Sequence, residues 1–296
     1  MQHFTSISII YNPTSTGSGK KLATELCHKL EVRLPNQKIA VVPTDYAGHA
    51  EELAYALAKK GKRPLIISVS GDGGYHEIVN GVMKAQAEGA HPTTGLLPAG
   101  NANDHFRNLH SYELVDAIAS GKTQIIDLLE LTYTEQGERH SRYAHSYIGF
   151  GFTPRAGQEL NKHKLNWFNQ IWLVAKVLLF LMRPVRIVIR GQHYSYDSLI
   201  FSNVPKMGKI LTLSDIADAS DGKFEIAAFR KRNKLRLIMT LFTASTTGLK
   251  VRRQAISYTF RTVKAELAQM DGEIITVDAD SRVTVSMQPK TLHCIV

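Results

Sequence analysis

A cluster of glycines and one carboxylate after an apolar segment is the part of this sequence best suited to bind a phosphate. Residues 64–69 (Pro-Leu-Ile-Ile-Ser-Val) are typical of a buried strand, and Ser70-Gly71-Asp72-Gly73-Gly74 follows directly. Glycine lets the main chain turn and approach a ligand closely, because it has no Cβ. A helical pattern begins there, and the first turn of a helix offers free N–H groups to an anion. The sequence therefore predicts a phosphate-binding turn in which Asp72 orients a nucleotide or a metal-bound water.

Two further turns combine glycine with short polar or acidic side chains. Pro98-Ala99-Gly100-Asn101-Ala102-Asn103-Asp104 follows a second short apolar run, and Gln269-Met270-Asp271-Gly272-Glu273 lies far downstream. Each of them alone is typical of a surface turn or a hairpin. Beside the turn at Gly71, the loop at Gly100 is predicted to form the second half of a nucleotide cradle.

The elements that must position these turns alternate between strand and helix over residues 1–127. Apolar periodicity predicts strands at 6–11, 39–43, 65–69 and 94–98, and helices at 19–34 and 47–60. This order favours a mostly parallel sheet with helices on both faces. Ligands of such folds bind outside the carboxyl ends of the strands. The loops at Asn12, Gly71 and Gly100 are therefore expected to converge on one ligand.

Beyond residue 127 the pattern changes to short runs of alternating polarity, which indicate antiparallel strands. The predicted strands are 125–132, 143–150, 185–189, 199–203, 223–229, 255–261, 273–277 and 282–287. The sequence thus predicts an α/β nucleotide-binding domain over residues 1–127, completed by residues 288–296. A C-terminal antiparallel β-sandwich domain is predicted over residues 128–287.

Taken together, these turns resemble the motifs of the diacylglycerol kinase catalytic-domain family, the bacterial soluble lipid kinases related to sphingosine kinases. The matching segments are Asn12-Pro13, the turn at 70–74, His76-Glu77, Asn80-Gly81, the loop at 98–104, Asp221-Gly222 and Asp271-Gly272-Glu273. The resemblance spans nearly the whole chain and implies an NAD-kinase/diacylglycerol-kinase-like fold. This chain departs from the family pattern Gly-Gly-Asp-Gly-Thr, because Ser70 replaces its first glycine and Gly74 its threonine. In the second loop, Asn101 stands where the family has threonine.

The resemblance implies an ATP-dependent lipid kinase that phosphorylates diacylglycerol, a sphingoid base or a similar long-chain alcohol. Asp271 or Glu273 would accept the proton of the acceptor hydroxyl, and the sequence does not separate them, because both flank the same turn. The residues that the resemblance places at the nucleotide are Asn12, Pro13, Thr44, Gly71, Asp72, Gly73, Gly74, Tyr75, His76, Glu77, Gly100, Asn101, Asn103 and Asp104.

The resemblance also implies two places for Mg²⁺. At the first, Asn103 and Asp104 hold the second loop and a catalytic magnesium. At the second, a structural magnesium is held by the Asp221 carboxylate and by the main-chain carbonyls of Asp218 and Lys223. Oxygen ligands suit this hard cation, and phosphoryl transfer depends mainly on positioning and charge neutralisation.

Two other functions stay open, and one is rejected. A kinase of a soluble acceptor such as NAD shares the glycine turn, but NAD kinases resemble one another in an Asn-Glu pair, which this chain lacks. The second open function is a module that binds nucleotide or lipid without catalysis, because Gly74 and Asn101 depart from the family pattern. A P-loop at Gly17-Ser18-Gly19-Lys20 is rejected, since it needs glycine at position 14 and Ser or Thr at position 21, where the chain has Thr14 and Lys21.

The charge of the chain indicates an anionic partner. The formal net charge is +10 over 296 residues, and basic residues at 230–253 flank an apolar run without any acid. This region is expected to contact an anionic membrane, whereas an amphipathic helix predicted at 165–182 is expected to pack on the protein's own sheet.

The remaining expectations concern surroundings and partners. The two cysteines, Cys27 and Cys294, imply no disulfide framework, and the first residues carry no signal-peptide pattern. We expect a cytoplasmic protein in peripheral contact with the membrane, with ATP and a lipid as partners and no nucleic acid. The oligomeric state, a homodimer included, stays open.

Overall fold

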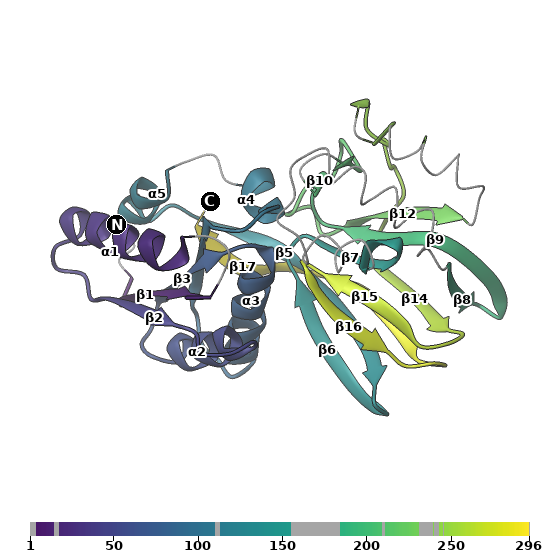
Figure 1. The fold of residues 1–296 in the computed structure, drawn as a ribbon, viewed down its shortest axis with the longest axis horizontal. Helices are drawn as coiled ribbons and strands as arrows, with labels where there is room; N and C mark the ends of the chain where they lie inside the picture. Colours follow the sequence, from purple (N-terminus) through teal and green to yellow (C-terminus); the bar gives the residue numbers. More distant parts are fainter. Residues whose placement is uncertain are drawn as a thin grey trace. The chain divides into compact units, whose positions relative to one another are not determined.

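The computed structural model describes residues 4–14, 18–109, 113–154, 184–208, 211–230, 239, 243–244 and 246–295 (Figure 1). The chain forms two compact units, which we call the α/β unit (Met1–Leu128 with Pro289–Val296) and the β unit (Leu129–Gln288). The chain passes from one unit into the other within strands β5 (Thr123–Glu135) and β17 (Arg282–Ile295).

Parallel strands build the sheet of the α/β unit, in the order β2-β1-β3-β4-β17. Their bounds are β1 (Ser6–Tyr11), β2 (Ile39–Pro43), β3 (Pro64–Ser70) and β4 (Thr93–Pro98). Strand β3 is buried up to its last residue, as expected when helices cover both faces of a parallel sheet. Tyr11 pairs with Pro43 and with Val69, and Val69 pairs with Leu97. The loops that follow β1, β2, β3 and β4 therefore emerge at one edge of the sheet.

Helices cover this sheet on both sides (Figure 1). They are α1 (Gly19–Arg33), α2 (His49–Ala58), α3 (Asp72–Ala87), α4 (Asp104–Leu109) and α5 (Leu114–Ser120). Leu26 of α1 and Ile118 of α5 pack with Ile67 of β3 in one core, while α2 and α3 lie on the other face (Figure 1). Helix α2 begins at His49, later than predicted, because Gly48 takes a left-handed conformation at φ 88°, which suits glycine.

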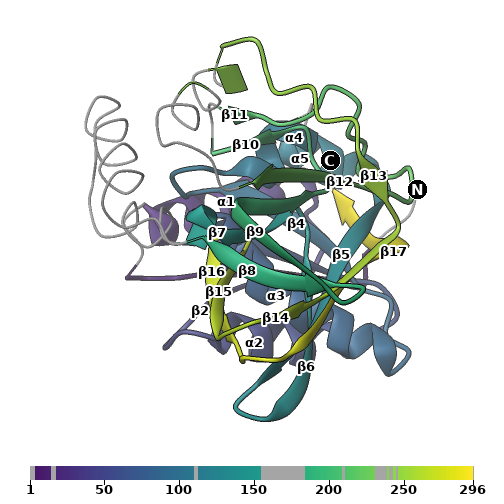
Figure 2. The ribbon, with the colours of Figure 1, turned by 90° about the vertical axis from the view of Figure 1, so that its right-hand side faces the viewer.

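Antiparallel strands make up the β unit, in the order β16-β15-β7-β9-β8-β14-β17. Figure 2 shows β7, β9 and β8 side by side. The bounds are β6 (Glu138–Ala144), β7 (Tyr147–Gly151), β8 (Val185–Ile189), β9 (Gln192–Ser202), β10 (Lys206–Met207), β11 (Leu211–Thr212), β12 (Phe224–Arg230), β13 (Gln254–Ala255), β14 (Ser257–Thr262), β15 (Glu266–Met270) and β16 (Glu273–Val277). Aromatic side chains dominate its core, and the rings of Phe150 and Phe260 meet edge to face at 5.3 Å.

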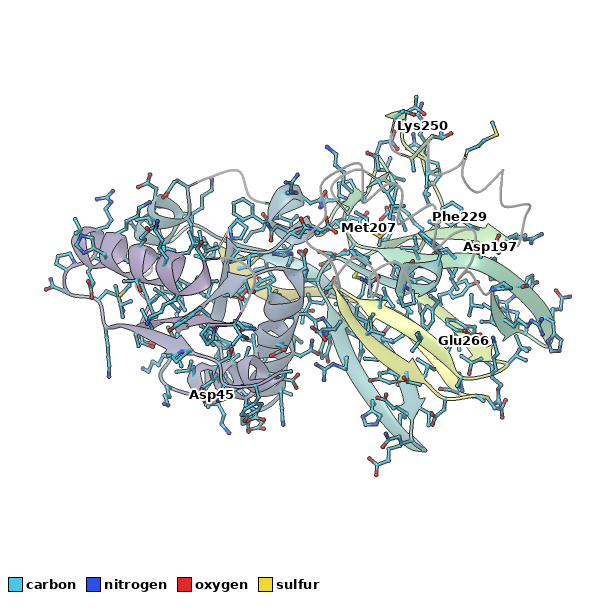
Figure 3. The ribbon with its side chains drawn as sticks, in the orientation of Figure 1. Asp45, Asp197, Met207, Phe229, Lys250 and Glu266 are labelled. Atoms are coloured by element: carbon cyan, nitrogen blue, oxygen red, sulfur yellow. The ribbon has the colours of Figure 1, made fainter. Side chains whose placement is uncertain are left out.

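A second apolar cluster of the β unit joins Tyr147, Ile200 and Met207 with the partly buried Phe229. Met207 and Phe229 are labelled in Figure 3. The cluster lies beside the main core and packs β10 and the segment around Leu213 onto β9 and β12.

The parallel α/β unit and the antiparallel β unit confirm the predicted fold class. The helix predicted at 165–182 and most of the basic region at 230–253 lie outside the described residues. Within the described ranges, no helix combines the length and the apolar character needed to span a membrane.

Candidate functional site

The glycine turn joins the end of β3 to the start of α3, as the sequence predicts. Gly71 is the N-cap residue of α3, with extended backbone at φ −87° and ψ −170°. It has no side chain that could cap the helix, which leaves the N–H groups of the first turn available to an anion. Gly73 and Gly74 lie within this first turn. The arrangement is suited to bind phosphate.

The loop after β4 packs directly against the glycine turn. A Cβ at Gly100 would lie 2.3 Å from the Gly71 Cα atom, so the two main chains can approach this closely only because residue 100 is glycine. The Ala99 N–H also donates to the Ser70 carbonyl at 2.8 Å. The structure thus brings together the two loops that the sequence predicts as halves of one cradle.

Asn103 fixes the shape of the second loop. Its Oδ1 accepts from the Gly100 N–H at 3.0 Å, and its Nδ2 donates to the Gly100 carbonyl at 3.0 Å. Asn103 has φ 53°, a left-handed conformation that asparagine tolerates better than most residues. Asn101, in contrast, is exposed.

Two carboxylates lie where these loops meet. Asp72 Oδ1 accepts from the His105 N–H at 3.1 Å, which joins the glycine turn to the first residues of α4. Asp104 starts α4 and is buried at 2% exposure. Asp72 therefore holds the two loops together while it places negative charge beside the phosphate-binding turn, where a cation could bind between carboxylate and phosphate.

The side chains after the glycine turn point into the α/β unit. Tyr75 and His76 are buried, and the Tyr75 hydroxyl hydrogen bonds with Thr94 Oγ1 at 2.8 Å. Glu77 Oε2 accepts from the Ala50 N–H at 3.2 Å, near the start of α2. These three residues position α3, and Tyr75 and His76 reach a ligand at the turn only through their main chain.

The loops after β1 and β2 lie at the same edge. Asn12 Oδ1 accepts from the N–H and the hydroxyl of Thr14, at 2.9 and 2.8 Å, while Asn12 and Pro13 are exposed. Thr44 is buried, and its N–H donates to the Tyr11 carbonyl at 2.9 Å. The structure thus places Asn12, Pro13 and Thr44 at the edge where the glycine turn lies.

An exposed aromatic side chain follows Thr44. Tyr46 is 56% exposed, and its ring stacks on the His49 ring with centroids 4.6 Å apart. The Tyr46 hydroxyl donates to Glu52 at 2.7 Å, and this hydrogen bond raises the pKa of Tyr46. The Asp45 N–H donates to His49 Nδ1 at 3.0 Å. The ring is therefore held in one orientation with much of its surface open to solvent, a feature that the sequence analysis missed.

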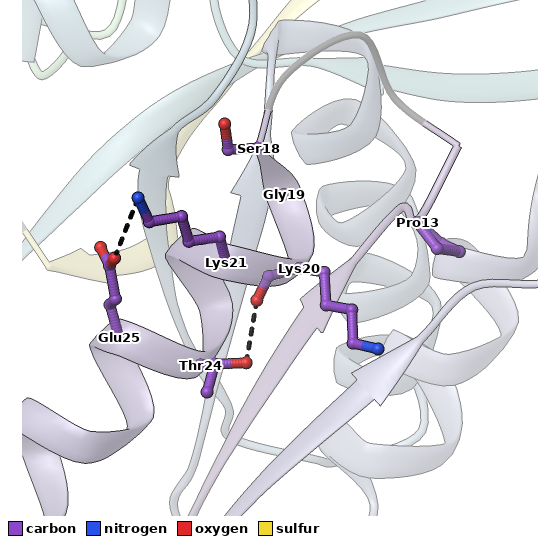
Figure 4. A pocket seen from close by; sticks show the side chains of 7 residues that line it. All are labelled: Pro13, Ser18, Gly19, Lys20, Lys21, Thr24 and Glu25. Carbon is purple, nitrogen blue, oxygen red and sulfur yellow. Dashed lines mark hydrogen bonds and ion pairs between the residues drawn. The ribbon is translucent and has the colours of Figure 1, made fainter.

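A depression of about 540 Å³ lies at the start of α1 (Figure 4). Its lining residues are Pro13, Ser18, Gly19, Lys20, Lys21, Thr24 and Glu25. Lys21 lies 3.8 Å from Glu25 in an exposed ion pair, and Ser18 forms no side-chain cap of α1. The two lysines and the helix start make this depression electropositive, although the sequence lacks a P-loop.

In the β unit, the turn between β15 and β16 holds Asp271 and Glu273. Asp271 and Gly272 have φ 50° and 101°, the pair of positive values typical of a tight hairpin turn. Asp271 is fully buried, whereas Glu273 is exposed. The sequence could not separate the two carboxylates, and the structure gives them opposite surroundings.

Main-chain donors surround the Asp271 carboxylate. Its Oδ1 accepts from the N–H groups of Ser146 and Tyr147, both at 3.0 Å. Its Oδ2 accepts from the His145 N–H at 2.6 Å and lies 3.4 Å from His145 Nε2. These donors favour the ionised carboxylate and lock the turn onto the segment before β7.

The loop before β12 holds the residues predicted to bind a structural magnesium. Asp221 Oδ1 accepts from the Lys223 N–H at 2.9 Å, and Asp218 Oδ1 accepts from the Ser220 N–H at 3.0 Å. Burial raises the pKa of the neighbouring Glu225, the Gln254 hydrogen bond opposes the rise, and Asp221 and Asp218 add to it. The loop is therefore a region of concentrated negative charge.

These oxygen donors fit a hydrated Mg²⁺, which binds through one or two carboxylates and keeps several waters. Within the described ranges, no three His, Cys, Asp or Glu side chains gather closely enough to hold a metal alone. A metal in this loop would therefore need main-chain carbonyls and water besides the Asp221 carboxylate.

Comparison with known proteins identifies the family. Residues 6–131 match the diacylglycerol kinase catalytic domain. A diacylglycerol kinase of Staphylococcus haemolyticus is 30% identical over 247 residues, which cover 79% of this chain and 70% of the relative. One of Bacillus subtilis is 25% identical over 263 residues, covering 85% of this chain and 82% of the relative. The chain belongs to the diacylglycerol kinase catalytic-domain family.

A solved structure has the same fold. A putative diacylglycerol kinase from Bacillus anthracis superposes with a TM-score of 0.75 at 19% identity, over 100% of this chain and 98% of the other. The family membership confirms the predicted class of enzyme, a kinase that acts on a lipid alcohol.

Proposed function

We propose that this chain transfers the γ-phosphoryl group of ATP to the hydroxyl of diacylglycerol or a related long-chain alcohol. The observation that carries this proposal is the close packing of the Gly71 turn on the Gly100 loop, at the carboxyl edge of a parallel sheet. This edge is where nucleotides bind in such folds, and the curated relatives are named diacylglycerol kinases.

The nucleotide would be held from two sides of the α/β unit. Neighbouring strands lie about 4.8 Å apart, so the loops after β2 and β3, with β1 between them, are separated by about 10 Å. That distance is comparable to the span from the base of a nucleotide to its outer phosphates. The N–H groups at the start of α3 would bind the phosphates, and the fixed, exposed ring of Tyr46 would stack on the base.

Mg²⁺, when bound with ATP, neutralises charge that develops on the phosphate oxygens. Asp72 and Asp104 are the carboxylates of the α/β unit suited to hold it, since both lie where the two loops meet. Asp221, with the carbonyls of Asp218 and Lys223, would hold the second, structural ion. We expect chelation of divalent cations to abolish phosphoryl transfer.

The Asp271–Glu273 turn would supply the carboxylate that accepts the proton of the lipid hydroxyl. Asp271 is fixed in place by three main-chain donors, whereas Glu273 has the exposure that a substrate contact needs. Removal of a general base typically lowers a rate by about 10²- to 10⁴-fold. The variants Asp271→Asn and Glu273→Gln, compared as kcat on folded protein, assign the role to one residue.

The lipid would be presented at a membrane surface. Lys250, Arg252 and Arg253 lie close together in the sequence of the β unit and near Ile256, which is 67% exposed. Arg252 lies 3.1 Å from Asp215, and Arg253 stacks over the Tyr258 ring at 5.4 Å. Each basic residue near an anionic surface contributes about 1 kcal/mol. Sedimentation with neutral and with anionic vesicles tests this contact, and equal binding to both would exclude it.

One assay tests the proposal as a whole. Purified protein is incubated with Mg²⁺ and ATP labelled at the γ-phosphate, over a panel of diacylglycerols, sphingoid bases and other long-chain alcohols, with NAD as a soluble acceptor. Asp72→Asn should lose nearly all activity, since asparagine keeps the acceptor for the His105 N–H but removes the charge. Asp116→Asn, an exposed aspartate in α5, is the matched control and should remain active. Transfer to NAD far above any lipid would replace the proposal with a soluble-acceptor kinase.

A further inference from the structure

Ser70 and Gly74 share one small volume at the start of α3. Ser70 is the last residue of β3, and Gly74 is the third residue of α3. A Cβ at Gly74 would lie 2.6 Å from Ser70 Oγ and 2.7 Å from Ser70 Cβ. Real Cβ atoms do not approach other atoms this closely. Any side chain at position 74 would therefore collide with the serine as it stands.

The Ser70 hydroxyl has a defined orientation. Its Oγ donates to the Gly71 carbonyl at 2.9 Å and lies 2.6 Å from Ser68 Oγ. Because Ser70 has one hydroxyl hydrogen, Ser68 is the donor in the second bond. The Gly71 carbonyl also accepts from the Tyr75 N–H at 3.2 Å. That carbonyl keeps a partner if the Ser70 hydroxyl turns to another acceptor.

Of the two hydrogen-bonded serines, Ser68 and Ser70, only Ser70 is exposed enough to contact a ligand. Ser68 is 1% exposed, whereas Ser70 is half-buried, like Gly71 and Asp72 beside it. The Ser70 hydroxyl therefore lies at the boundary between the core and the phosphate-binding turn. Its neighbour Ser68 holds it from the buried side.

We propose that Ser70 supplies the side-chain hydroxyl of the phosphate-binding turn, and that position 74 is glycine to make room for it. The family pattern carries a hydroxyl at position 74 and glycine at position 70. This chain carries the hydroxyl at 70 and glycine at 74, in the same volume. Ser70 would donate to a phosphate oxygen of ATP, in an inference that rests on the proposed nucleotide site. The two departures from the family pattern, at positions 70 and 74, are then a single exchange of a hydroxyl between the two positions. The turn therefore keeps one hydroxyl that can bind phosphate.

Four variants test the exchange: Ser70→Ala, Ser70→Gly, Gly74→Thr, and the double variant Ser70→Gly/Gly74→Thr. Binding of a non-hydrolysable ATP analogue and of AMP is measured by calorimetry with Mg²⁺, and thermal unfolding of the ligand-free proteins reports folding. Ser70→Ala removes only the hydroxyl. It should weaken binding of the ATP analogue about 10- to 100-fold, as expected for a hydrogen bond to a charged group, with AMP binding within about 3-fold of wild type.

The double variant separates the exchange from two independent losses. Gly74→Thr alone should lower the midpoint of thermal unfolding and weaken binding of the ATP analogue, because its side chain meets Ser70. Replacing Ser70 with glycine in the Gly74→Thr variant should restore both the unfolding midpoint and the binding of the ATP analogue. The effects of the two substitutions should therefore not add. A double variant that unfolds at a lower temperature and binds the ATP analogue more weakly than either single variant would show that the two side chains do not compete for one volume.

The proposed contact between the Ser70 hydroxyl and phosphate can be refuted separately from the shared volume. If Ser70→Ala binds the ATP analogue as wild type does, the hydroxyl makes no contact with phosphate, although the proposed function stands. If Ser70→Ala weakens AMP and the ATP analogue equally, the effect is a general distortion, and the phosphate role is again wrong. Wild-type protein that binds no nucleotide would overturn the proposed function and this role together.

Discussion

The buried Asp271 carboxylate should stabilise the β unit independently of any role in catalysis. Asparagine at this position keeps one carbonyl oxygen, which can still accept from the N–H groups of Ser146 and Tyr147. It places an NH₂ group against the His145 N–H, which now donates to Asp271 Oδ2 at 2.6 Å. Asp271→Asn therefore loses one charged hydrogen bond and leaves buried donors without an acceptor.

The expected cost can be worked out from these contacts. A hydrogen bond to a charged group contributes about 1.5–3 kcal/mol, and a buried unsatisfied donor costs about 1–3 kcal/mol. Together they predict a loss of about 2.5–6 kcal/mol in the free energy of unfolding. For a unit of this size, that corresponds to a decrease of roughly 10 °C in the midpoint of thermal unfolding.

Calorimetric unfolding of Asp271→Asn beside Glu273→Gln measures this effect. Glu273 is exposed, so its substitution should change stability by less than about 0.5 kcal/mol. The reasoning is refuted if Asp271→Asn unfolds at the wild-type temperature, since the three main-chain donors would then contribute nothing. Because activity lost through unfolding resembles activity lost through chemistry, kcat of both variants should be compared well below the lower midpoint.

Three further outcomes follow from the structure. Gly100→Ala should reduce nucleotide binding and destabilise the α/β unit by about 1–3 kcal/mol, because its Cβ would lie 2.3 Å from Gly71 Cα. Gly95→Ala is the control for loss of a glycine, because its added Cβ would meet its nearest neighbour, Ile67 Cγ1, at an ordinary contact distance of 3.5 Å. Tyr46→Ala should weaken ATP binding about 10- to 100-fold, as loss of one stacked base contact does. Tyr46→Phe keeps the ring and should bind ATP nearly as well as the wild type. Equal ATP binding by all three proteins would exclude stacking of Tyr46 on the base. Glu225→Gln should raise stability at pH 7, because burial raises the pKa of Glu225. The native state then holds this proton more tightly than the unfolded state, and wild-type stability falls as pH rises above about 4.5. Urea unfolding in the absence of divalent cations, at pH 7 and at pH 4, should show the advantage of Glu225→Gln at the higher pH only.

The sequence predicted the α/β unit well because its signals are local. Strands such as β3 are continuous apolar runs that end in glycine or proline, and helices α1 and α2 carry apolar residues at helical spacing. Hairpin β5–β6 shows where such signals fail. Strand β6 reads Glu-Arg-His-Ser-Arg-Tyr-Ala, and only its last residue is buried, so it has no apolar alternation to detect. Only its pairing with β5 makes it a strand.

The site was predictable as a set of turns and not as a set of contacts. The positions of Gly71 and Gly100 after neighbouring strands implied that their loops meet, and the structure shows them touching. The sequence carried no sign that Tyr46 matters, because exposed tyrosines are common in loops. Only the structure shows that His49 and Glu52 fix its ring. Burial separated Asp271 from Glu273, and burial depends on Ser146 and Tyr147, which lie more than a hundred residues away in the chain.

The substitutions at positions 70 and 74 show why a motif should be interpreted in three dimensions. Along the sequence, Ser70 and Gly74 are two separate departures, and Gly74 alone suggests that the turn has lost a phosphate contact. In space, the first turn of α3 places residue 74 directly beside residue 70, the last residue of β3. One side chain can fill that place from either position, and here it comes from Ser70. The loss of a hydroxyl at position 74 is therefore weak evidence against catalysis, because the Ser70 side chain, which carries a hydroxyl, fills the space that a side chain at position 74 would enter.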